Sequence, residues 1–386
     1  MEKPGKPGKL RKYREEKRDR MDQDNTYRNP AEEEKREIDT KLTKCPRCGA
    51  NMEFDPKTQG LRCPYCQTLQ SLPQDLKTAE IDLEEAFRSG EKWEEDATVF
   101  ECKNCSAKVV LEKGETAKRC PFCGAGNIVP SEEMAGVKPN GVLPFRLTAE
   151  EGAVAAGKWA KKRLFAPRRF RKKLSPENVA GVYSPCFTFD SCTSSTYQGQ
   201  LGKHYTVTVT DSKGRTHTET RTRYFSVSGS LEKGFDDILV NAGSKIDDKM
   251  MSKLRPFDTN SGLAYRPEFL SGFMANHYDR PVTEMWNEAK SRMDSEIKRA
   301  IVAQYDADVV SYLNVSTRHE RVTYKYVLLP VYVGNFNYKK KAYNFFVNGI
   351  SGKTAGKAPV SPIKVAITAV FGIAALLLLA WLIMRA

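Results

Sequence analysis

Histidine is scarce in this chain of 386 residues, which has only four. The four are His204, His217, His277 and His319. They fall in separate predicted elements, and no nucleophile pattern accompanies them. A P-loop is also lacking, because the SGKT stretch at 351–354 has Val347 where the motif requires glycine. The sequence therefore offers no catalytic constellation and no evident small-molecule substrate, and it predicts a protein that is not an enzyme.

The first forty residues lack the apolar segment of a secretory signal. They are interrupted by proline and glycine and are dense in charges of both signs. Such a segment cannot bury enough apolar surface to fold. We expect residues 1–40 to form a disordered, charged and solubilising tail.

Cysteine is rare outside two short stretches. Residues 45–66 read CPRCGANMEFDPKTQGLRCPYC and residues 102–123 read CKNCSAKVVLEKGETAKRCPFC. Each stretch holds two CxxC pairs separated by fourteen residues. The candidate metal ligands are Cys45, Cys48, Cys63, Cys66, Cys102, Cys105, Cys120 and Cys123. The remaining two, Cys186 and Cys192, would need two further ligands to make a third site.

Four thiolates at this spacing favour one tetrahedral Zn²⁺ per stretch, so we expect two structural zinc ions. A β-prone piece and a turn-rich piece lie between the pairs in each copy, as in the hairpin of a zinc ribbon. Gly49 and Gly124 allow the positive φ that such turns often need. With four cysteines no ligand position is open, which predicts a structural site. Iron could occupy it, but no other redox feature supports iron.

The chain is basic, with a formal charge of +14, which fits an anionic partner such as nucleic acid or an anionic lipid surface. Basic residues near the cysteines could contact phosphate, or they could only offset the negative charge of the metal–thiolate groups. They are Lys44, Arg47, Arg62, Lys103, Lys118 and Arg119. We favour the second interpretation. An acidic spacer between the two ribbons also argues against continuous phosphate contact.

A run of twenty uncharged residues, Val365 to Met384, indicates a transmembrane helix. Lys353, Lys357 and Lys364 precede it and only Arg385 follows it. The positive-inside rule then predicts a tail-anchored, single-pass protein of the cell membrane whose N-terminal domains are cytoplasmic. In the reducing cytosol, paired cysteines are metal ligands rather than disulfides.

The pattern between these features predicts an α+β domain at 131–360. Thr148 begins a helix that should reach about Phe165, and a DSKG turn joins the strands of a hairpin at 204–231. A helix is expected around 247–257, then a long one from Pro281 with an apolar stripe, then strands to about 353. SGKT is best interpreted as the turn after the last of these strands.

The end of the first of these helices and the loop after it are strongly basic. The basic residues are Lys158, Lys161, Lys162, Arg163, Arg168, Arg169, Arg171, Lys172 and Lys173, interleaved with Trp159, Phe165 and Phe170. The cluster could be a solvated face, a phosphate-backbone patch or a membrane-surface contact. The downstream anchor favours lipid over nucleic acid, and a solvated face is the simplest of the three.

The paired CPxC ribbons, GVYSPCFTFD, the block LPVYVGNFNYKKKAYNFFVNGISGKTAGKAP and the span that follows it resemble a family of bacterial membrane-anchored TFIIB-type zinc-ribbon proteins. Members are often labelled as primosomal-helicase-related because of their ribbons. The resemblance covers most of the chain after about Lys41. One departure is Pro185-Cys186-Phe187, where the family usually has a PFW-like segment. The resemblance implies a non-enzymatic cytoplasmic adaptor, with phage-shock and SPFH-type envelope-stress partners in some relatives.

Together these observations predict a multidomain fold of two small β zinc ribbons, an α+β domain and one C-terminal transmembrane helix. The expected boundaries are 1–40 (tail), 41–72 (ribbon 1), 73–98 (acidic helical linker), 99–130 (ribbon 2), 131–360 (α+β domain) and 363–385 (transmembrane helix). The leading hypothesis is a membrane-anchored scaffold that recruits proteins to the cytoplasmic surface. The alternative is a membrane-associated nucleic-acid-binding protein.

Overall fold

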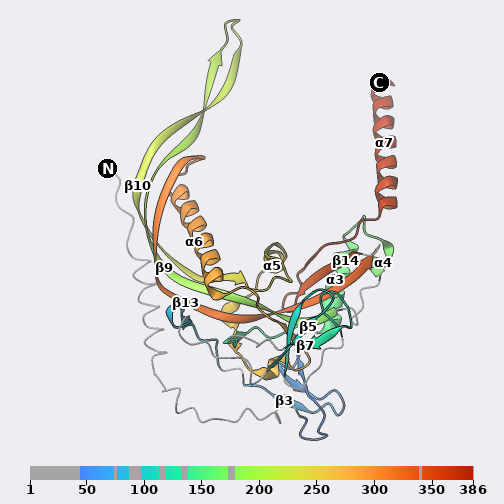
Figure 1. Ribbon diagram of the computed structural model, residues 1–386. Coiled ribbons are helices and arrows are strands. Elements are labelled where there is room, and N and C mark those ends of the chain that lie inside the picture. Colours follow the sequence, from blue (N-terminus) through green and yellow to red (C-terminus); the bar gives the residue numbers. More distant parts are fainter. Residues whose placement is uncertain are drawn as a thin grey trace.

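The computed structural model describes residues 44–73, 76–86, 97–112, 119–131, 138–172, 179–338 and 341–385. The expected tail at 1–40 lies outside these residues. Two sheets organise the described chain, one of three strands and one of twelve (Figure 1). Helices pack on the larger sheet, and one apolar helix stands apart from it. This arrangement agrees with the expected combination of sheets, helices and one apolar C-terminal helix.

The small sheet belongs to the first cysteine repeat. Its antiparallel strands are β1 (Glu53–Asp55), β2 (Gly60–Arg62) and β3 (Leu69–Ser71). Phe54 on β1 packs edge-on against Phe269 at a ring-centroid distance of 5.4 Å, and its N–H donates to Ser271 O (3.0 Å). The small sheet is therefore packed on the larger part of the protein by its side chains: Phe54 and Leu61 lie in the same hydrophobic cluster as Phe145, and Lys57 pairs with Glu151 (2.6 Å).

Three long strands form the centre of the large sheet: β9 (Val179–Thr210), β10 (Thr216–Asn241) and β13 (Val309–Tyr338). β9 pairs antiparallel with both of the others. The expected hairpin is confirmed, since Thr210 pairs with Thr216 across the DSKG turn and Asp211 Oδ1 accepts from the N–H groups of Lys213 and Arg215. Gly214 has φ 77° there, which favours glycine. The hairpin projects from the body as an arm (Figure 1).

The second cysteine repeat is joined to this sheet by backbone hydrogen bonds. Its strands are β5 (Ala97–Cys102), β6 (Lys108–Glu112) and β7 (Ile128–Pro130). β6 pairs with β12 (Met274–Asn276), and β12 pairs in parallel with β9. The sheet therefore runs without a break across the boundary expected at residue 130, whereas the first repeat has a sheet of its own.

Short strands complete the large sheet: β4 (Ile81–Asp82), β8 (Gly141–Val142), β11 (Leu263–Ala264), β14 (Lys341–Asn348) and β15 (Thr354–Gly356). The SGKT stretch lies at the turn between β14 and β15, which pair with each other. The expected turn is present, but one more short strand follows it.

The long helix α6 (Val282–Gln304) lies along β9 and β10 (Figure 1). Its expected apolar stripe is confirmed, because the buried side chains recur at helical spacing: Met285, Ala289, Met293, Ile297 and Ile301. Trp286 adds an aromatic contact with Phe189 on β9 at 5.5 Å. The helix is thus a core element.

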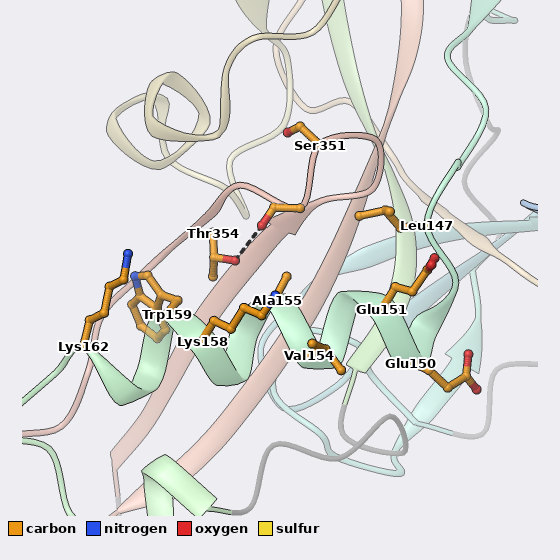
Figure 2. Close-up of a pocket in the computed structure, with 11 residues that line it drawn as sticks. Leu147, Glu150, Glu151, Val154, Ala155, Lys158, Trp159, Lys162, Ser351 and Thr354 are labelled. Carbon is orange, nitrogen blue, oxygen red and sulfur yellow. Dashed lines mark hydrogen bonds between the residues drawn. The ribbon is translucent and has the colours of Figure 1, made fainter.

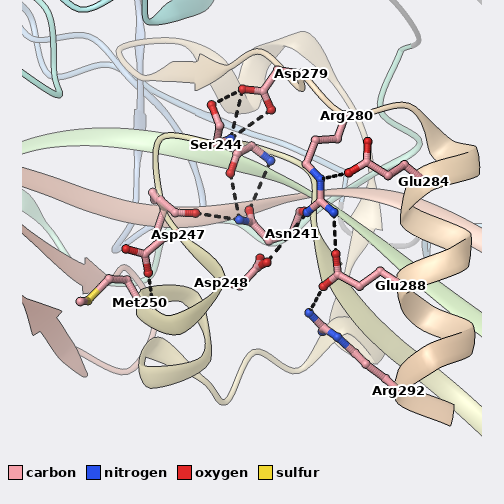
Figure 3. Close-up of polar contacts among 12 residues, drawn as sticks. Asn241, Ser244, Asp247, Asp248, Met250, Asp279, Arg280, Glu284, Glu288 and Arg292 are labelled. Carbon is pink, nitrogen blue, oxygen red and sulfur yellow. Dashed lines mark hydrogen bonds and ion pairs between the residues drawn. The ribbon is translucent and has the colours of Figure 1, made fainter. Parts of the chain in front are cut away.

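A polar network fastens the start of α6 to the end of β10 (Figure 3). Arg280 donates to Glu284 (2.8 Å), to Glu288 (2.6 Å) and to the carbonyl of Asn241 (3.1 Å). Arg292, one turn beyond Glu288, donates to it as well. These contacts fix the helix against the sheet edge, where α5 (Asp248–Leu254) also begins with Asp247 as its N-cap.

Helix α3 (Ala149–Lys161) has the expected capping box of Thr148 and Glu151. It ends four residues before the expected Phe165, which is a correction to the sequence analysis. The carbonyl of Phe165 instead accepts from the N–H of Ser361, just before α7 (Pro362–Arg385). A tertiary contact thus replaces the last helical turn, and a short helix α4 (Arg168–Lys172) follows.

The acidic linker is only partly helical within the described residues. α2 (Leu83–Ala86) follows β4, which pairs with β13. The expected apolar points Phe87 and Trp93 lie outside the described residues. Two 3-10 turns, Thr259–Ser261 and Pro267–Leu270, complete the helical elements that the structure describes.

Candidate metal centres

The first repeat brings its four cysteines together. The ligand atoms of Cys45, Cys48, Cys63 and Cys66 all lie within 4.8 Å of one another. The Sγ atoms of Cys45 and Cys66 are 3.4 Å apart, and those of Cys48 and Cys63 are 3.5 Å apart. Four sulfurs at 2.3 Å from one tetrahedral ion would be about 3.8 Å apart. The set is therefore close to the size that a single metal ion requires.

The second repeat has the same arrangement. Its ligand atoms also lie within 4.8 Å of one another. Cys102 Sγ lies 3.6 Å from Cys123 Sγ, and Cys105 Sγ lies 3.7 Å from Cys120 Sγ. The pairing of first with fourth and second with third cysteine is the same in both copies. Two groups able to hold one metal ion each are thus present, at the eight positions expected from the sequence.

All four CxxC turns share one backbone design. The residue after each second cysteine donates its N–H to the carbonyl of the first cysteine, at distances from 2.8 to 3.0 Å. These residues all have positive φ: Gly49 (71°), Gln67 (61°), Ser106 (52°) and Gly124 (76°). The two glycines were expected from the sequence. The other two were missed, because glutamine and serine give no signal of a left-handed conformation.

The thiols of each repeat ionise unequally. In the first repeat, hydrogen bonds from the side chain and backbone of Thr68 lower the pKa of Cys66 to about 6. The N–H of Ala50 lowers the pKa of Cys48, but contacts with Cys63 and Cys66 outweigh it and raise the value to about 12. The low pKa of Cys66 favours its thiolate form, and a metal that binds all four sulfurs must displace a proton from Cys48.

The second repeat is more deeply built into the core. Burial raises the pKa of Cys123, but the Asn104 side chain and the N–H of Ala125 bring it down to about 7. Phe122, between the last two cysteines, is buried in a cluster with Met251 and Leu254 of α5. Its ligand turns therefore touch residues that are far away in the sequence, and a change at this centre reaches the main core.

Three of the six basic residues beside the cysteines are engaged within their own repeat. Arg62 pairs with Asp55 (2.7 Å), Lys103 pairs with Glu101 (2.5 Å), and Lys44 donates to Asn51. Arg47 and Arg119 are exposed, and Lys118 lies outside the described residues. Such pairs indicate that these residues balance local charge, and they weigh against a phosphate-binding surface.

A third group of possible ligands is acidic and was not foreseen. Carboxylate oxygens of Glu80, Asp190 and Asp236 lie within 4.8 Å of one another. The buried ammonium group of Lys325 lies 2.6 Å from Asp237 and 4.0 Å from Glu80. Because a protein cation already lies in this cluster, we interpret the group as a charge network that joins β9, β10 and β13, with Asp190 and Lys325 buried and Glu80 and Asp236 exposed. Its members are far apart in the sequence, so no local pattern predicts this network.

This network should make stability depend on pH. Burial, and then the charge of Glu80, raises the pKa of Asp190 from 3.8 to about 8. Because the folded state binds this proton more tightly than the unfolded state, its stabilising contribution is complete below about pH 4 and is lost as the pH rises to about 8. We expect a loss of about 1–2 kcal/mol in the free energy of unfolding between pH 6 and pH 8.5.

Thermal unfolding over that pH range tests this expectation. Asp190→Asn, which cannot titrate, should flatten the dependence. Asp306→Asn is the matched control, because Asp306 is exposed and its contact with Lys203 lowers its pKa. A slope that is the same in Asp190→Asn and in the unmodified chain would contradict the assignment.

The other residues singled out by the sequence are dispersed. Cys186 is buried on β9, and burial raises the pKa of its thiol. Cys192 Sγ accepts from Arg321 (3.3 Å). His319 lies against Trp286, whereas His204 and His217 lie on the hairpin arm. The structure brings none of them to the metal centres.

An open groove of about 640 Å³ lies between α3 and the SGKT turn (Figure 2). Its walls carry both charge signs, with Glu150 and Glu151 at one end and Lys158 and Lys162 toward the other. Trp159 forms part of the wall and leaves the groove partly apolar. The groove thus combines acidic, basic and apolar lining residues.

Comparisons with known proteins give one informative match. The chain is similar to the uncharacterized protein YdjG of Bacillus subtilis (strain 168), with 29% identity over 332 residues. The match covers 84% of this chain and 91% of YdjG. No family model matches the chain, and no solved structure matches it. The similarity spans nearly the full length of both chains and transfers no activity.

Proposed function

We propose that each cysteine repeat is a zinc ribbon with one structural Zn²⁺. Support comes from the sulfur separations of 3.4–3.7 Å and from the all-thiolate ligand set, which suits zinc. Four cysteines complete a tetrahedral shell, so the ion would hold the turns together and leave no position for a reacting water. This proposal fits the resemblance to TFIIB-type zinc-ribbon proteins, which itself stays a prediction.

We propose further that α7 anchors the protein in a membrane. The helix has 24 residues with a mean hydropathy of 2.6 over its most apolar window, and none of that window is buried inside the protein. At 1.5 Å per residue it is about 36 Å long, enough to cross a bilayer core of about 30 Å. The excess of lysine before it supports an orientation with the sheets and metal centres in the cytoplasm.

The biochemical role we propose is that of a scaffold that holds proteins at the cytoplasmic face of the membrane. The observation that carries this role is the apolar helix α7, whose most apolar window is not buried inside the protein. The two cysteine centres fit a structural part in it, because four cysteines would leave no ligand position open for a reaction. The projecting arm and the groove beside α3 offer surfaces for protein contacts. The engagement of Arg62 and Lys103 by acidic neighbours weighs against nucleic acid as the main partner.

Crosslinking in intact cells, followed by mass spectrometry, tests this role because it detects protein and nucleotide adducts together. We expect protein–protein crosslinks from the arm and the groove, enriched in the membrane fraction. Ile373→Arg with Leu377→Arg, two changes in the exposed middle of α7, should remove that enrichment.

The opposite result would be nucleotide adducts near Arg47 or Arg119 without protein adducts. Purified chain that binds duplex DNA with micromolar affinity and a steep dependence on salt would also support the nucleic-acid alternative. Either outcome would replace the scaffold proposal.

A further inference from the structure

The segment from Lys161 to Arg169, KKRLFAPRR, runs from the last residue of α3 to the first turn of α4 and is attached to the start of the apolar helix; we refer to it as the anchor loop. The N–H of Ser361 donates to Phe165 O (2.8 Å). Lys364 Nζ, in the first turn of α7, donates to Leu164 O (3.2 Å) and to Ala166 O (2.6 Å). These bonds hold the loop where α7 leaves the body. If α7 spans a bilayer, the anchor loop lies at its surface.

Two apolar side chains of the anchor loop point away from the core. Leu164 is 71% exposed and Phe165 is 43% exposed. Their neighbours Ala166 and Phe170 are buried, and Phe170 meets Trp159 edge-on at 5.9 Å. The buried Ala166 and Phe170 therefore fix the loop on the body, while the side chains of Leu164 and Phe165, its apolar tip, face outward. An apolar tip on a fixed backbone gains free energy where it can leave water, as it can among lipid headgroups.

The apolar tip is flanked by positive charge on both sides. The exposed basic residues are Lys161, Lys162, Arg163, Arg168 and Arg169. Arg163 also stacks over the Trp159 ring at 4.9 Å, which keeps its guanidinium beside the tip. Basic residues near a membrane surface are attracted to anionic lipids. Apolar residues between basic ones are the pattern of a segment that lies in the interface.

We propose that the anchor loop is a second membrane-contact site, which inserts Leu164 and Phe165 among the headgroups of an anionic leaflet and places its basic residues against lipid phosphates. The sequence alone favoured a solvated face for this cluster, and the hydrogen bonds to α7 change that interpretation. The inference rests on the proposed anchoring by α7. Two points of attachment would fix the orientation of the body on the membrane, which a single helix does not.

Photocrosslinking in lipid nanodiscs tests the proposal with the full chain. Leu164, Phe371 or Leu69 is replaced singly by benzoylphenylalanine, and lipid adducts are measured by mass spectrometry. Phe371 lies in the middle of α7 and reports on anchoring itself. Leu69, on β3, is exposed and lies on the far side of the body from α7 (Figure 1). We expect adducts at positions 164 and 371 and none at 69.

The charge component is tested in the same discs. Changing the five basic residues of the loop to glutamine should lower the adduct yield at position 164 by about threefold or more in anionic discs and little in neutral ones. The control changes exposed basic residues of the first cysteine repeat to glutamine and should leave the yield unaltered, because the β3 strand of that repeat lies on the far side of the body from α7 (Figure 1). These are Lys44, Arg47 and Lys57.

The outcomes separate the two proposals. Adducts at 371 without adducts at 164 would overturn the contact site and leave the anchor intact. A lack of adducts at 371 would overturn the anchor, and the contact site with it. Binding of duplex DNA that is lost in the loop variant, together with no lipid adduct at 164, would assign the loop to nucleic acid instead.

Discussion

Replacing Cys120 by serine is expected to destabilise the main body of the protein as well as the second cysteine repeat. The strands of this repeat continue into the large sheet through β6 and β12. Phe122, two residues from Cys120, is buried with Met251 and Leu254 of α5. Loss of the metal would release the turn that holds Phe122 in place, so the cost extends to the core.

The expected magnitude follows from the metal. Structural zinc supplies roughly 10 kcal/mol or more of apparent folding free energy in small zinc domains. If about half of this free energy contributes to the stability of the large sheet, the midpoint of thermal unfolding falls by about 10 °C or more. Differential scanning fluorimetry on the full chain in detergent measures it. Cys192→Ser is the control, because Cys192 belongs to neither four-cysteine group and its Sγ accepts a hydrogen bond from Arg321.

The second large effect is expected to stay local. Cys63→Ser should unfold the first repeat and leave the thermal transition of the large sheet within a few degrees. The first repeat has its own three-stranded sheet, and within the described residues no strand pairing joins that sheet to the large one. Its buried side chains Phe54 and Leu61 belong to the same hydrophobic cluster as Phe145, and Gln59 donates to Phe145 O (2.8 Å). The first repeat is therefore linked to the body by side-chain packing without a shared strand ladder, so we expect its unfolding to cost the body less than a break in the large sheet.

Amide hydrogen exchange distinguishes local from global unfolding. In Cys63→Ser, residues 44–73 should lose protection while β9 and β13 keep it. A transition lowered as far as in Cys120→Ser would show that the two repeats are coupled to the body equally. That result would contradict the difference in sheet connectivity.

Local patterns in the sequence predicted the cysteine sets, the hairpin and the long helix well. The four-cysteine spacing fixes which thiols can meet, because each CxxC turn is short and the two copies agree. The stripe from Met285 to Ile301 predicts α6 because burial on one helix face needs no knowledge of the partner surface. These features depend on residues that are close together in the chain.

The rest depended on contacts between distant residues. The pairing of Val110 with Ala275 joins the second repeat to the large sheet over more than 160 residues of chain, and no local pattern encodes it. The end of α3 is likewise set by distant residues, because the N–H of Ser361 and the Nζ of Lys364 donate to carbonyls of the anchor loop. The network around Lys325 likewise assembles charges from four separate segments.

These distant contacts change the view of how the parts cooperate. The second repeat is integrated into the sheet, the first is docked on it, and the loop after α3 is tied to the apolar helix. A scaffold built in this way would hold one metal-stabilised hairpin in a fixed orientation relative to the proposed membrane surface.

Counting metal ions per chain tests the central claim most directly. Elemental analysis of the purified full chain should give two zinc ions per molecule. Cys63→Ser and Cys120→Ser should each give one, and Cys192→Ser should give two. A chain that carries one zinc ion or none, or cysteine variants that keep both ions, would contradict the account of two independent four-cysteine centres.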